Sequence, residues 1–203
     1  AGAGQPSRPC VFYCKQMQTR KSLRLKKYDY ATPGAYFVTV CTRDKRWLFG
    51  ENNLPPWCSL VSVGRDPCVP PPATTPPCAL QVNIVRKVIS EWIGKIPSKF
   101  PNWTVDKWVV MPNHIHLLLQ LHAGNAAGHM GPALQDVMRW YKTMTTNACI
   151  QAVKAGKIKP FEKAIWQTSF YDEVIRDQAH YLRIWQYIDT NPARWAEDEY
   201  YIN

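Results

Sequence analysis

The order of the elements that the sequence predicts is typical of an α+β protein with a ferredoxin-like antiparallel sheet and helices packed against it. Three observations support this fold class. The predicted segments follow one another as strand, insertion, helix, strand, strand, helix, strand and helix; a Pro-Asn turn signal at residues 112–113 joins two of the strands; and the helical segments carry apolar stripes. A chain of 203 residues fits one such domain with tails or an insertion.

The first strand and the first helix flank a segment rich in proline. Residues 34–42 (GAYFVTVCT) are largely β-branched and aromatic and follow a Pro-Gly turn signal, which predicts a strand. Residues 53–78 hold eight of the 17 prolines, which is typical of a loop or a semi-rigid insertion. The next helix begins at Ala79, and its inward stripe consists of Val82, Val85, Val88, Ile89 and Trp92.

The hairpin and the second helix come next. Residues 102–112 (NWTVDKWVVMP) and residues 114–121 (HIHLLLQL) predict two strands joined by the Pro-Asn turn. Residues 133–153 predict an amphipathic helix, whose inward residues are Leu134, Val137, Met138, Tyr141 and Met144.

One strand and one helix complete the order. Residues 165–176 (IWQTSFYDEVIR) predict the last strand. Residues 177–192 predict the last helix, with Asp177 as its N-cap and Pro192 as its stop.

The charge of the chain is basic and unevenly distributed. The net charge is +10, from 25 Lys and Arg against 15 Asp and Glu, and seven basic residues precede the first acidic one, Asp29. A basic arm suits a polyanion such as nucleic acid, although a solvated tail has the same composition. We interpret residues 1–19 as a flexible basic arm or a cloning remnant, residues 20–197 as the domain, and residues 198–203 as a C-terminal tail.

Membrane and secretory classes are disfavoured. No stretch has the ~18 consecutive apolar residues that a membrane helix needs, and the first residues lack the apolar core of a signal peptide. The seven cysteines form no CxxC pair, so reduced thiols are expected. These features predict a cytoplasmic protein, associated with the nucleoid if it binds DNA, with no membrane partner.

Two histidines interrupt an otherwise apolar strand. Side chains alternate along a strand, so His114 and His116 point to the same face, roughly 7 Å apart. Ile115 and Leu117 point to the other face, into the helices. Two neutral imidazoles on one face can share a metal ion. The alternative is two polar ring edges on a half-exposed sheet face, which requires no metal.

The last helix offers a hydroxyl and a third ligand. Tyr187 and Asn191 are four residues apart and so lie on one helix face, although Pro192 biases Asn191 away from helical geometry. An amide oxygen together with two histidines suits Mg²⁺ or Mn²⁺. Tyr187 would then lie beside the metal, or it is a buried aromatic residue that hydrogen-bonds at its tip.

These residues lie in segments that resemble a known family. VVMPNHIHLLL (residues 109–119) resembles the HUH motif, His-hydrophobic-His, of single-tyrosine transposases. Residues 166–195 resemble the C-terminal signature of the REP-associated tyrosine transposases, and residues 24–51 resemble the N-terminal block of that branch. The resemblance covers the chain from about Ser22 to Trp195, apart from the insertion, and it implies an HUH endonuclease fold of ferredoxin-like type.

The resemblance also implies an activity and its residues. His114 and His116 match the metal-binding pair, Tyr187 matches the catalytic nucleophile, and Asn191 matches the third metal ligand. The substrate that the family implies is single-stranded DNA bearing an imperfect hairpin, of the repetitive extragenic palindrome type. With a divalent cation, Mg²⁺ or Mn²⁺, such an enzyme cleaves and rejoins this strand through a covalent 5′-phosphotyrosine.

Several alternatives stay open at this point. Tyr171, on the last predicted strand, is a rival nucleophile without an amide at metal spacing. A domesticated protein that recognises DNA hairpins without mobilising them is the main competing function, and an RNA-binding ferredoxin-like domain is a third. The oligomeric state is open between a monomer acting in cis and a homodimer with exchanged tyrosine helices.

Candidate DNA contacts combine basic and aromatic residues, because unstacked bases stack on rings while Lys and Arg hold phosphates. The alternatives are solvated surface charges and a tryptophan that caps the core. His122, His129 and His180 are interpreted as surface or loop histidines. The candidate DNA-binding residues are Arg24, Lys26, Lys27, Arg139, Trp140 and Lys142.

Overall fold

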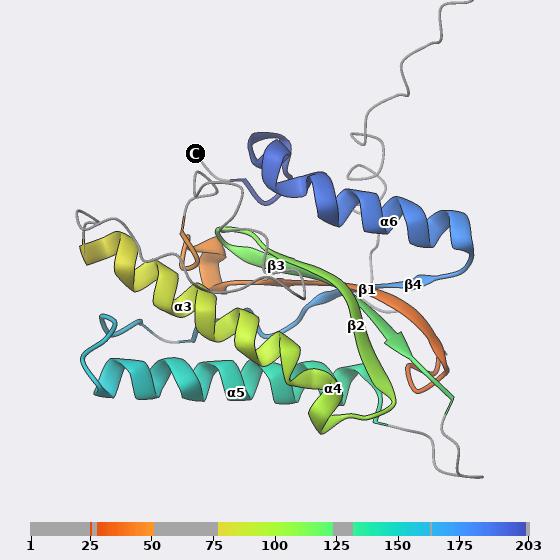
Figure 1. The fold of residues 1–203 in the computed structure, drawn as a ribbon, viewed down its shortest axis with the longest axis horizontal. Coiled ribbons are helices and arrows are strands. Elements are labelled where there is room, and N and C mark those ends of the chain that lie inside the picture. The colour runs from red at the N-terminus through yellow and green to blue at the C-terminus, as the bar shows by residue number, and fades with distance from the viewer. Residues whose placement is uncertain (1–24, 26–27, 51–76, 124–131, 163, 202–203) are drawn as a thin grey trace, which may run out of the picture.

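The computed structural model describes residues 25, 28–50, 77–123, 132–162 and 164–201 (Figure 1). Three of the candidate DNA contacts lie outside the described residues, as do His129, the N-terminal arm and nearly all of the proline-rich insertion. The three contacts are Arg24, Lys26 and Lys27.

The sheet has the predicted ferredoxin-like topology. Its four strands are β1 (Gly34–Cys41), β2 (Trp103–Val110), β3 (His114–Leu121) and β4 (Tyr171–Ile175). They lie in the order β2-β3-β1-β4, and all neighbours are antiparallel. The last strand is shorter than predicted, because the chain at Trp166 makes only an isolated bridge to Thr42 before the regular pairing begins at Tyr171.

The helices follow the predicted order. They are α3 (Pro77–Gly94), α4 (Ile96–Lys99), α5 (Leu134–Lys154) and α6 (Gln178–Thr190), with short 3-10 helices η1 (Arg43–Lys45) and η2 (Asn191–Glu197). No helix in the described part of the chain is long and apolar enough to cross a membrane.

The two ends of α6 show how the sequence sets its limits. Asp177 is the N-cap, as predicted, because its Oδ1 accepts a hydrogen bond from the His180 backbone N–H at 2.7 Å. The α-helix ends at Thr190, but Asn191 keeps helical angles (φ −57°, ψ −42°) despite the following Pro192. The bias before proline is therefore overridden here, since Pro192 sits at the start of η2, where a proline is tolerated.

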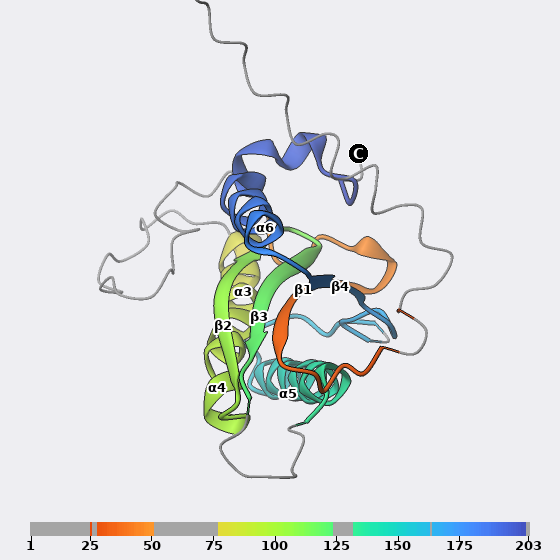
Figure 2. The same ribbon diagram turned by 90° about the vertical axis from the view of Figure 1, so that its right-hand side faces the viewer.

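Helices cover both faces of the sheet. Helices α3 and α5 lie on one face and α6 on the other (Figures 1 and 2). Ile115 and Leu117 of β3 belong to the core on the α3/α5 side, as predicted, while Leu118 packs with Ile184 of α6. The histidine face is thus covered by α6, so the interpretation of His114 and His116 on a half-exposed face is wrong: both are 0% exposed.

The inward stripe of α5 differs from the prediction at one position. Met144 is only half-buried, and Thr145 is buried in its place. The polar side chain is accommodated because Thr145 Oγ1 donates to the Tyr141 carbonyl at 2.8 Å and accepts from Trp166 Nε1 at 2.9 Å. A stripe of apolar letters could not reveal these partners.

A candidate metal and tyrosine site

The two histidines of β3 face one another at the centre of a buried polar cluster. Their Nε2 atoms are 2.9 Å apart. On the far side of each ring, His114 Nδ1 is 2.8 Å from Asn113 Oδ1, and His116 Nδ1 is 2.8 Å from Thr39 Oγ1. The register explains the second contact, because Thr39 of β1 is directly opposite His116. Both Nε2 atoms are therefore directed to one point.

Helix α6 brings Tyr187 to this point. The Tyr187 Oη lies 3.4 Å from His116 Nε2, and the two ring centroids are 5.1 Å apart. Ile184 and Ile188, on the same helix face, pack with Phe37 and hold the helix on the sheet. The side chain that sequence comparison selected as the nucleophile is thus beside the predicted metal pair, with only 6% of its surface exposed.

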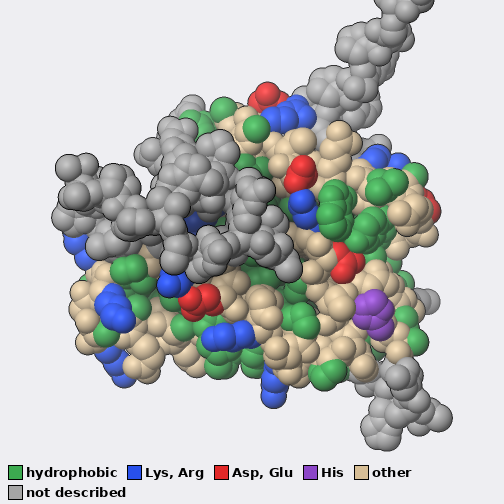
Figure 3. Space-filling model, in the orientation of Figure 1, with side chains coloured by type: hydrophobic (Ala, Val, Ile, Leu, Met, Phe, Trp, Pro, Cys, Tyr) green, Lys and Arg blue, Asp and Glu red, His purple; other side chains and the backbone are tan. Residues whose placement is uncertain are grey.

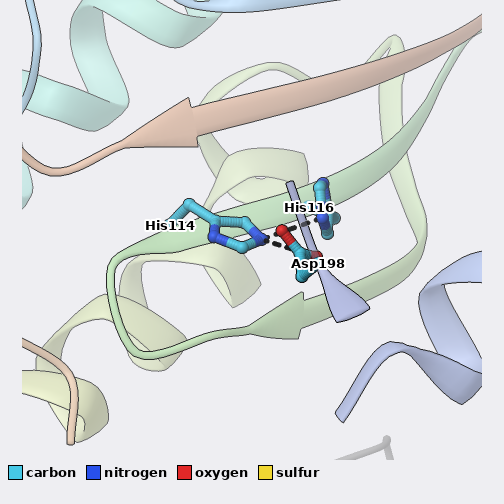
Figure 4. A group of neighbouring side chains, drawn as sticks. All are labelled: His114, His116 and Asp198. Atoms are coloured by element: carbon cyan, nitrogen blue, oxygen red, sulfur yellow. Dashed lines mark hydrogen bonds and ion pairs between the residues drawn. The ribbon is translucent and has the colours of Figure 1, made fainter. Parts of the chain in front are cut away.

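The structure adds Asp198, which the sequence did not single out. Figure 4 shows its carboxylate beside both histidines, with Oδ2 3.8 Å from His114 Nε2. One ligand atom from each of the three residues lies within 4.8 Å of the others. Asp198 Oδ1 accepts from the Tyr200 backbone N–H at 2.7 Å, whereas Oδ2 has no hydrogen-bond partner in the described structure. Residues assigned to a C-terminal tail therefore form part of the cluster.

Asn191 lies at the edge of the same cluster. It is buried, its backbone N–H donates to the Tyr187 carbonyl, and its side chain is close enough to Asp198 to lower the pKa of that carboxyl. Its Nδ2 has no hydrogen-bond partner among the described residues. The predicted third ligand, Asn191, therefore lies next to Asp198, whose carboxylate belongs to the group of possible metal ligands.

Burial determines the charge states. Desolvation lowers the pKa of His116 to about 3 and the pKa of His114 well below its usual range, the latter with help from His116 and Lys45. Both imidazoles are thus neutral at neutral pH, as metal ligation requires. Burial raises the pKa of Asp198. The hydrogen bond from the Tyr200 backbone opposes that rise, and so does the nearby Asn191 side chain.

The donor set fits a divalent cation. It contains two neutral imidazole nitrogens and a buried carboxylate oxygen with no hydrogen-bond partner, all within reach of one point, with an amide beside them. Nitrogen and carboxylate ligands of this kind bind divalent metals, and an orphaned buried oxygen is what a missing cation would leave. The cluster thus fits the metal that the sequence predicted.

The candidate DNA contacts on α5 lie away from this cluster, since α5 covers the other face of the sheet (Figure 2). Arg139 is exposed and pairs with Asp136 at 3.0 Å, and Lys142 Nζ donates to the Thr168 carbonyl at 2.8 Å. Both line a cavity of about 530 Å³ between α5 and residues 164–170. Trp140 is partly buried and packs against the core beside Trp92, at 5.6 Å between ring centroids, which agrees with the alternative interpretation of a capping residue.

The other candidate tyrosine and histidines have partners of their own. Tyr171 donates to Glu173 Oε2 at 3.2 Å. His180, expected at the surface, is instead buried, because its ring packs at the N-terminus of α6 with Nε2 3.3 Å from Glu173 Oε1. His122 is exposed, with Nε2 3.1 Å from Thr104 Oγ1.

The visible Lys and Arg side chains give no single continuous patch. On the described part of the face in Figure 3 they lie at separate places among apolar and acidic side chains. The described Lys and Arg side chains on that face are therefore not gathered in one area.

Fold and site together define a class of protein. A ferredoxin-like sheet that presents a His-hydrophobic-His strand to a tyrosine on a C-terminal helix is the arrangement of the HUH tyrosine transposases. The chain belongs to the IS200-like transposase family, whose family model matches residues 79–191, more than half of its length. It is therefore a DNA-processing enzyme of the transposase type.

The chain is also similar to individual proteins. An uncharacterised protein of Haemophilus influenzae (strain ATCC 51907 / DSM 11121 / KW20 / Rd) is 28% identical over 193 residues, which cover 91% of this chain and 94% of that protein. The structure of a REP-associated tyrosine transposase bound to a REP hairpin is similar in fold. It has a TM-score of 0.51 and 19% sequence identity, over 87% of this chain and 76% of that one.

Proposed function

We propose that the protein is a metal-dependent single-stranded DNA endonuclease and strand transferase that acts on hairpin-bearing palindromic DNA through Tyr187. The observation that carries the proposal is the Tyr187 hydroxyl, 3.4 Å from His116 Nε2 in a buried cluster of ligand atoms. A hydroxyl nucleophile next to ligands for a divalent ion is what metal-assisted cleavage of a phosphodiester requires.

Each residue has a distinct role in the proposed chemistry. His114, His116 and Asp198 hold the ion, with Asn191 as a further oxygen donor beside them. When bound, the divalent ion polarises a non-bridging phosphate oxygen and stabilises charge on the leaving oxygen. Helix α6 holds the Tyr187 ring against Phe37 and His116, which fixes the direction of its hydroxyl.

The covalent step can be written in full. Tyr187 Oη attacks the scissile phosphorus, an Oη–P bond forms, and the bond from phosphorus to the 3′ oxygen breaks. The tyrosine proton passes through solvent to the leaving oxygen, which gives a free 3′-hydroxyl and a 5′-phosphotyrosine. Attack by a 3′-hydroxyl on the phosphotyrosine reverses the step and reseals the strand.

Access to Tyr187 sets a condition on this chemistry. The histidines are fully buried, and the ring of Tyr200 lies 4.7 Å from that of His114. We propose that the segment from Asp198 to Tyr201 shifts to admit a phosphate to the Tyr187 hydroxyl, because Tyr200 and Tyr201 pack against the cluster that contains Tyr187.

The substrate class rests on the family, the charge and the hairpin-bound neighbour. Arg139 and Lys142 line the cavity beside α5, and we propose them as phosphate contacts together with Arg24, Lys26 and Lys27. Trp140 is left out of the proposed set, because its partly buried ring packs against the core. A monomer and a homodimer are both compatible with these contacts.

The test uses single-stranded oligonucleotides with a palindromic hairpin and unpaired flanks, incubated with the protein and Mn²⁺ or Mg²⁺. On a denaturing gel we expect a covalent protein–DNA band that Tyr187→Phe and chelation both remove, while Tyr171→Phe keeps it. Hairpin binding without an adduct would contradict the proposal and support a domesticated hairpin-binding protein. An adduct that survives Tyr187→Phe would assign the nucleophile to another tyrosine.

A further inference from the structure

Asn113, immediately before the first histidine, is fully buried, and both ends of its side-chain amide have hydrogen-bond partners. Its Nδ2 donates to the Tyr200 carbonyl at 2.7 Å and to the Lys45 carbonyl at 3.2 Å. Its Oδ1 is 2.8 Å from His114 Nδ1. The three partners come from the C-terminal segment, from η1 and from β3, so one amide links all three to the site.

These partners fix the orientation of the amide. Backbone carbonyls can only accept hydrogen bonds, so the end of the amide that faces Lys45 and Tyr200 must be the NH₂ group. The oxygen therefore faces His114 and must accept from it. It follows that His114 carries its proton on Nδ1 and has a lone pair on Nε2.

The contact between the two histidines determines the tautomer of His116 in the metal-free site. The two Nε2 atoms are 2.9 Å apart, a distance that requires one hydrogen between them. Since His114 Nε2 has only a lone pair, the hydrogen belongs to His116 Nε2. His116 Nδ1 is then an acceptor, and the Thr39 hydroxyl, 2.8 Å away, donates to it. The two histidines therefore have opposite tautomers.

We propose that Asn113 is a positioning residue that holds the His114 Nε2 lone pair toward the ion, and that Thr39 lets His116 change tautomer when an ion binds. Ligation through both Nε2 atoms requires the His116 proton to move from Nε2 to Nδ1. A hydroxyl can accept as well as donate, so Thr39 satisfies His116 in both states. Asn113, held by two carbonyls, allows only one state of His114.

This inference rests on the metal-binding part of the proposed function, but its first test does not. Nitrogen NMR of the ¹⁵N-histidine-labelled, metal-free wild type, with resonances assigned through His122→Gln, His129→Gln and His180→Gln, reports which nitrogen is protonated. We expect the proton on Nδ1 of His114 and on Nε2 of His116. Addition of Mg²⁺, a diamagnetic ion, should move the His116 proton to Nδ1. A His114 proton on Nε2 in the wild type would overturn the inference, whether or not the protein cleaves DNA.

Substitutions separate positioning from packing. Asn113→Leu removes the acceptor and should weaken Mn²⁺ binding about 10- to 100-fold in calorimetry and let His114 adopt both tautomers. Asn113→Asp keeps an oxygen toward His114 and should keep its tautomer, although it loses the two donated bonds. Thr39→Val should weaken Mn²⁺ binding as well, because His116 Nδ1–H would lose its acceptor.

The matched control is Thr104→Val, which removes a threonine–imidazole contact outside the site, to His122 at 3.1 Å. It should leave Mn²⁺ affinity unchanged. Mn²⁺ affinity within twofold of wild type in both Asn113→Leu and Thr39→Val would refute the positioning role. If Asn113→Leu does not fold, the wild-type spectrum and Thr39→Val still decide the question.

Discussion

The two faces of β3 are equally buried but carry different kinds of side chain. Toward α3 and α5 the strand presents Ile115 and Leu117, whose neighbours are apolar. Toward α6 it presents His114 and His116, in a cluster where Asp198 Oδ2 and Asn191 Nδ2 have no hydrogen-bond partner among the described residues. Unsatisfied buried polar atoms cost stability, so the α3/α5 face contributes apolar packing alone, while the α6 face combines the packing of Leu118 with a polar cluster that fits the proposed chemistry.

The largest expected effect is on the α6 face. Tyr187→Phe removes only the hydroxyl, so the rate of adduct formation should fall by at least about 1,000-fold while the fold is preserved. The measurement is the adduct yield over time on a hairpin oligonucleotide, with a thermal melt as the control for folding. Tyr171→Phe, the same change on β4, should stay within about twofold of wild type. A comparable loss of adduct formation in Tyr187→Phe and Tyr171→Phe would contradict the assignment of the nucleophile to Tyr187.

Adjacent leucines of β3 test the division of roles directly. Leu117 and Leu118 are both fully buried, on opposite faces, and each change to alanine should cost about 2–5 kcal/mol of unfolding free energy. Leu118 packs in the same cluster as Tyr187, so only Leu118→Ala should also slow adduct formation by the folded protein. Denaturant titrations give the stability, and rates are compared at temperatures where both variants are folded. Equal rates in the two variants would show that the faces are less separate than their side chains indicate.

The sequence predicted most of this architecture, and what it missed has a physical reason. Periodicity and turn residues identify elements, and strand alternation placed His114 and His116 on the face opposite Leu117. Asp198 was not predicted, because it approaches the histidines only through the return of the chain after η2. It lies 82 positions beyond His116 in the sequence and outside the segment that the family model matches. The partners Thr39 and Asn113 also required strand register and side-chain geometry. The alternative of two histidines on a half-exposed face is wrong because no local pattern shows that a distant helix covers the strand.

Asp198→Asn tests whether the carboxylate on the α6 face binds the metal at a cost to the free energy of unfolding. Loss of the carboxylate should weaken Mn²⁺ binding about 10- to 100-fold, an effect comparable to changes around other metal sites. In chelator, the variant should be as stable as wild type or more stable by up to about 1 kcal/mol, since ionising a buried carboxylate is costly. Calorimetry with Mn²⁺ and denaturant titration in chelator measure the two quantities. Asp189→Asn, at an exposed carboxylate on α6, is the control that should change neither.

The smallest expected effect concerns the α5 face, which would contribute to DNA binding without taking part in the chemistry. Arg139→Gln removes an exposed charge that pairs with Asp136, and Lys87→Gln removes a matched exposed charge on α3 that pairs with Glu91 at 4.0 Å. If Arg139 contacts a phosphate, its loss should weaken hairpin binding a few-fold and reduce the slope of log affinity against log salt by about 1, whereas Lys87→Gln should leave the slope unchanged. Fluorescence anisotropy over a range of salt concentrations separates the two cases. Equal slopes in both variants would show that other basic residues contact the hairpin and that the α5 face contributes only to the stability of the fold.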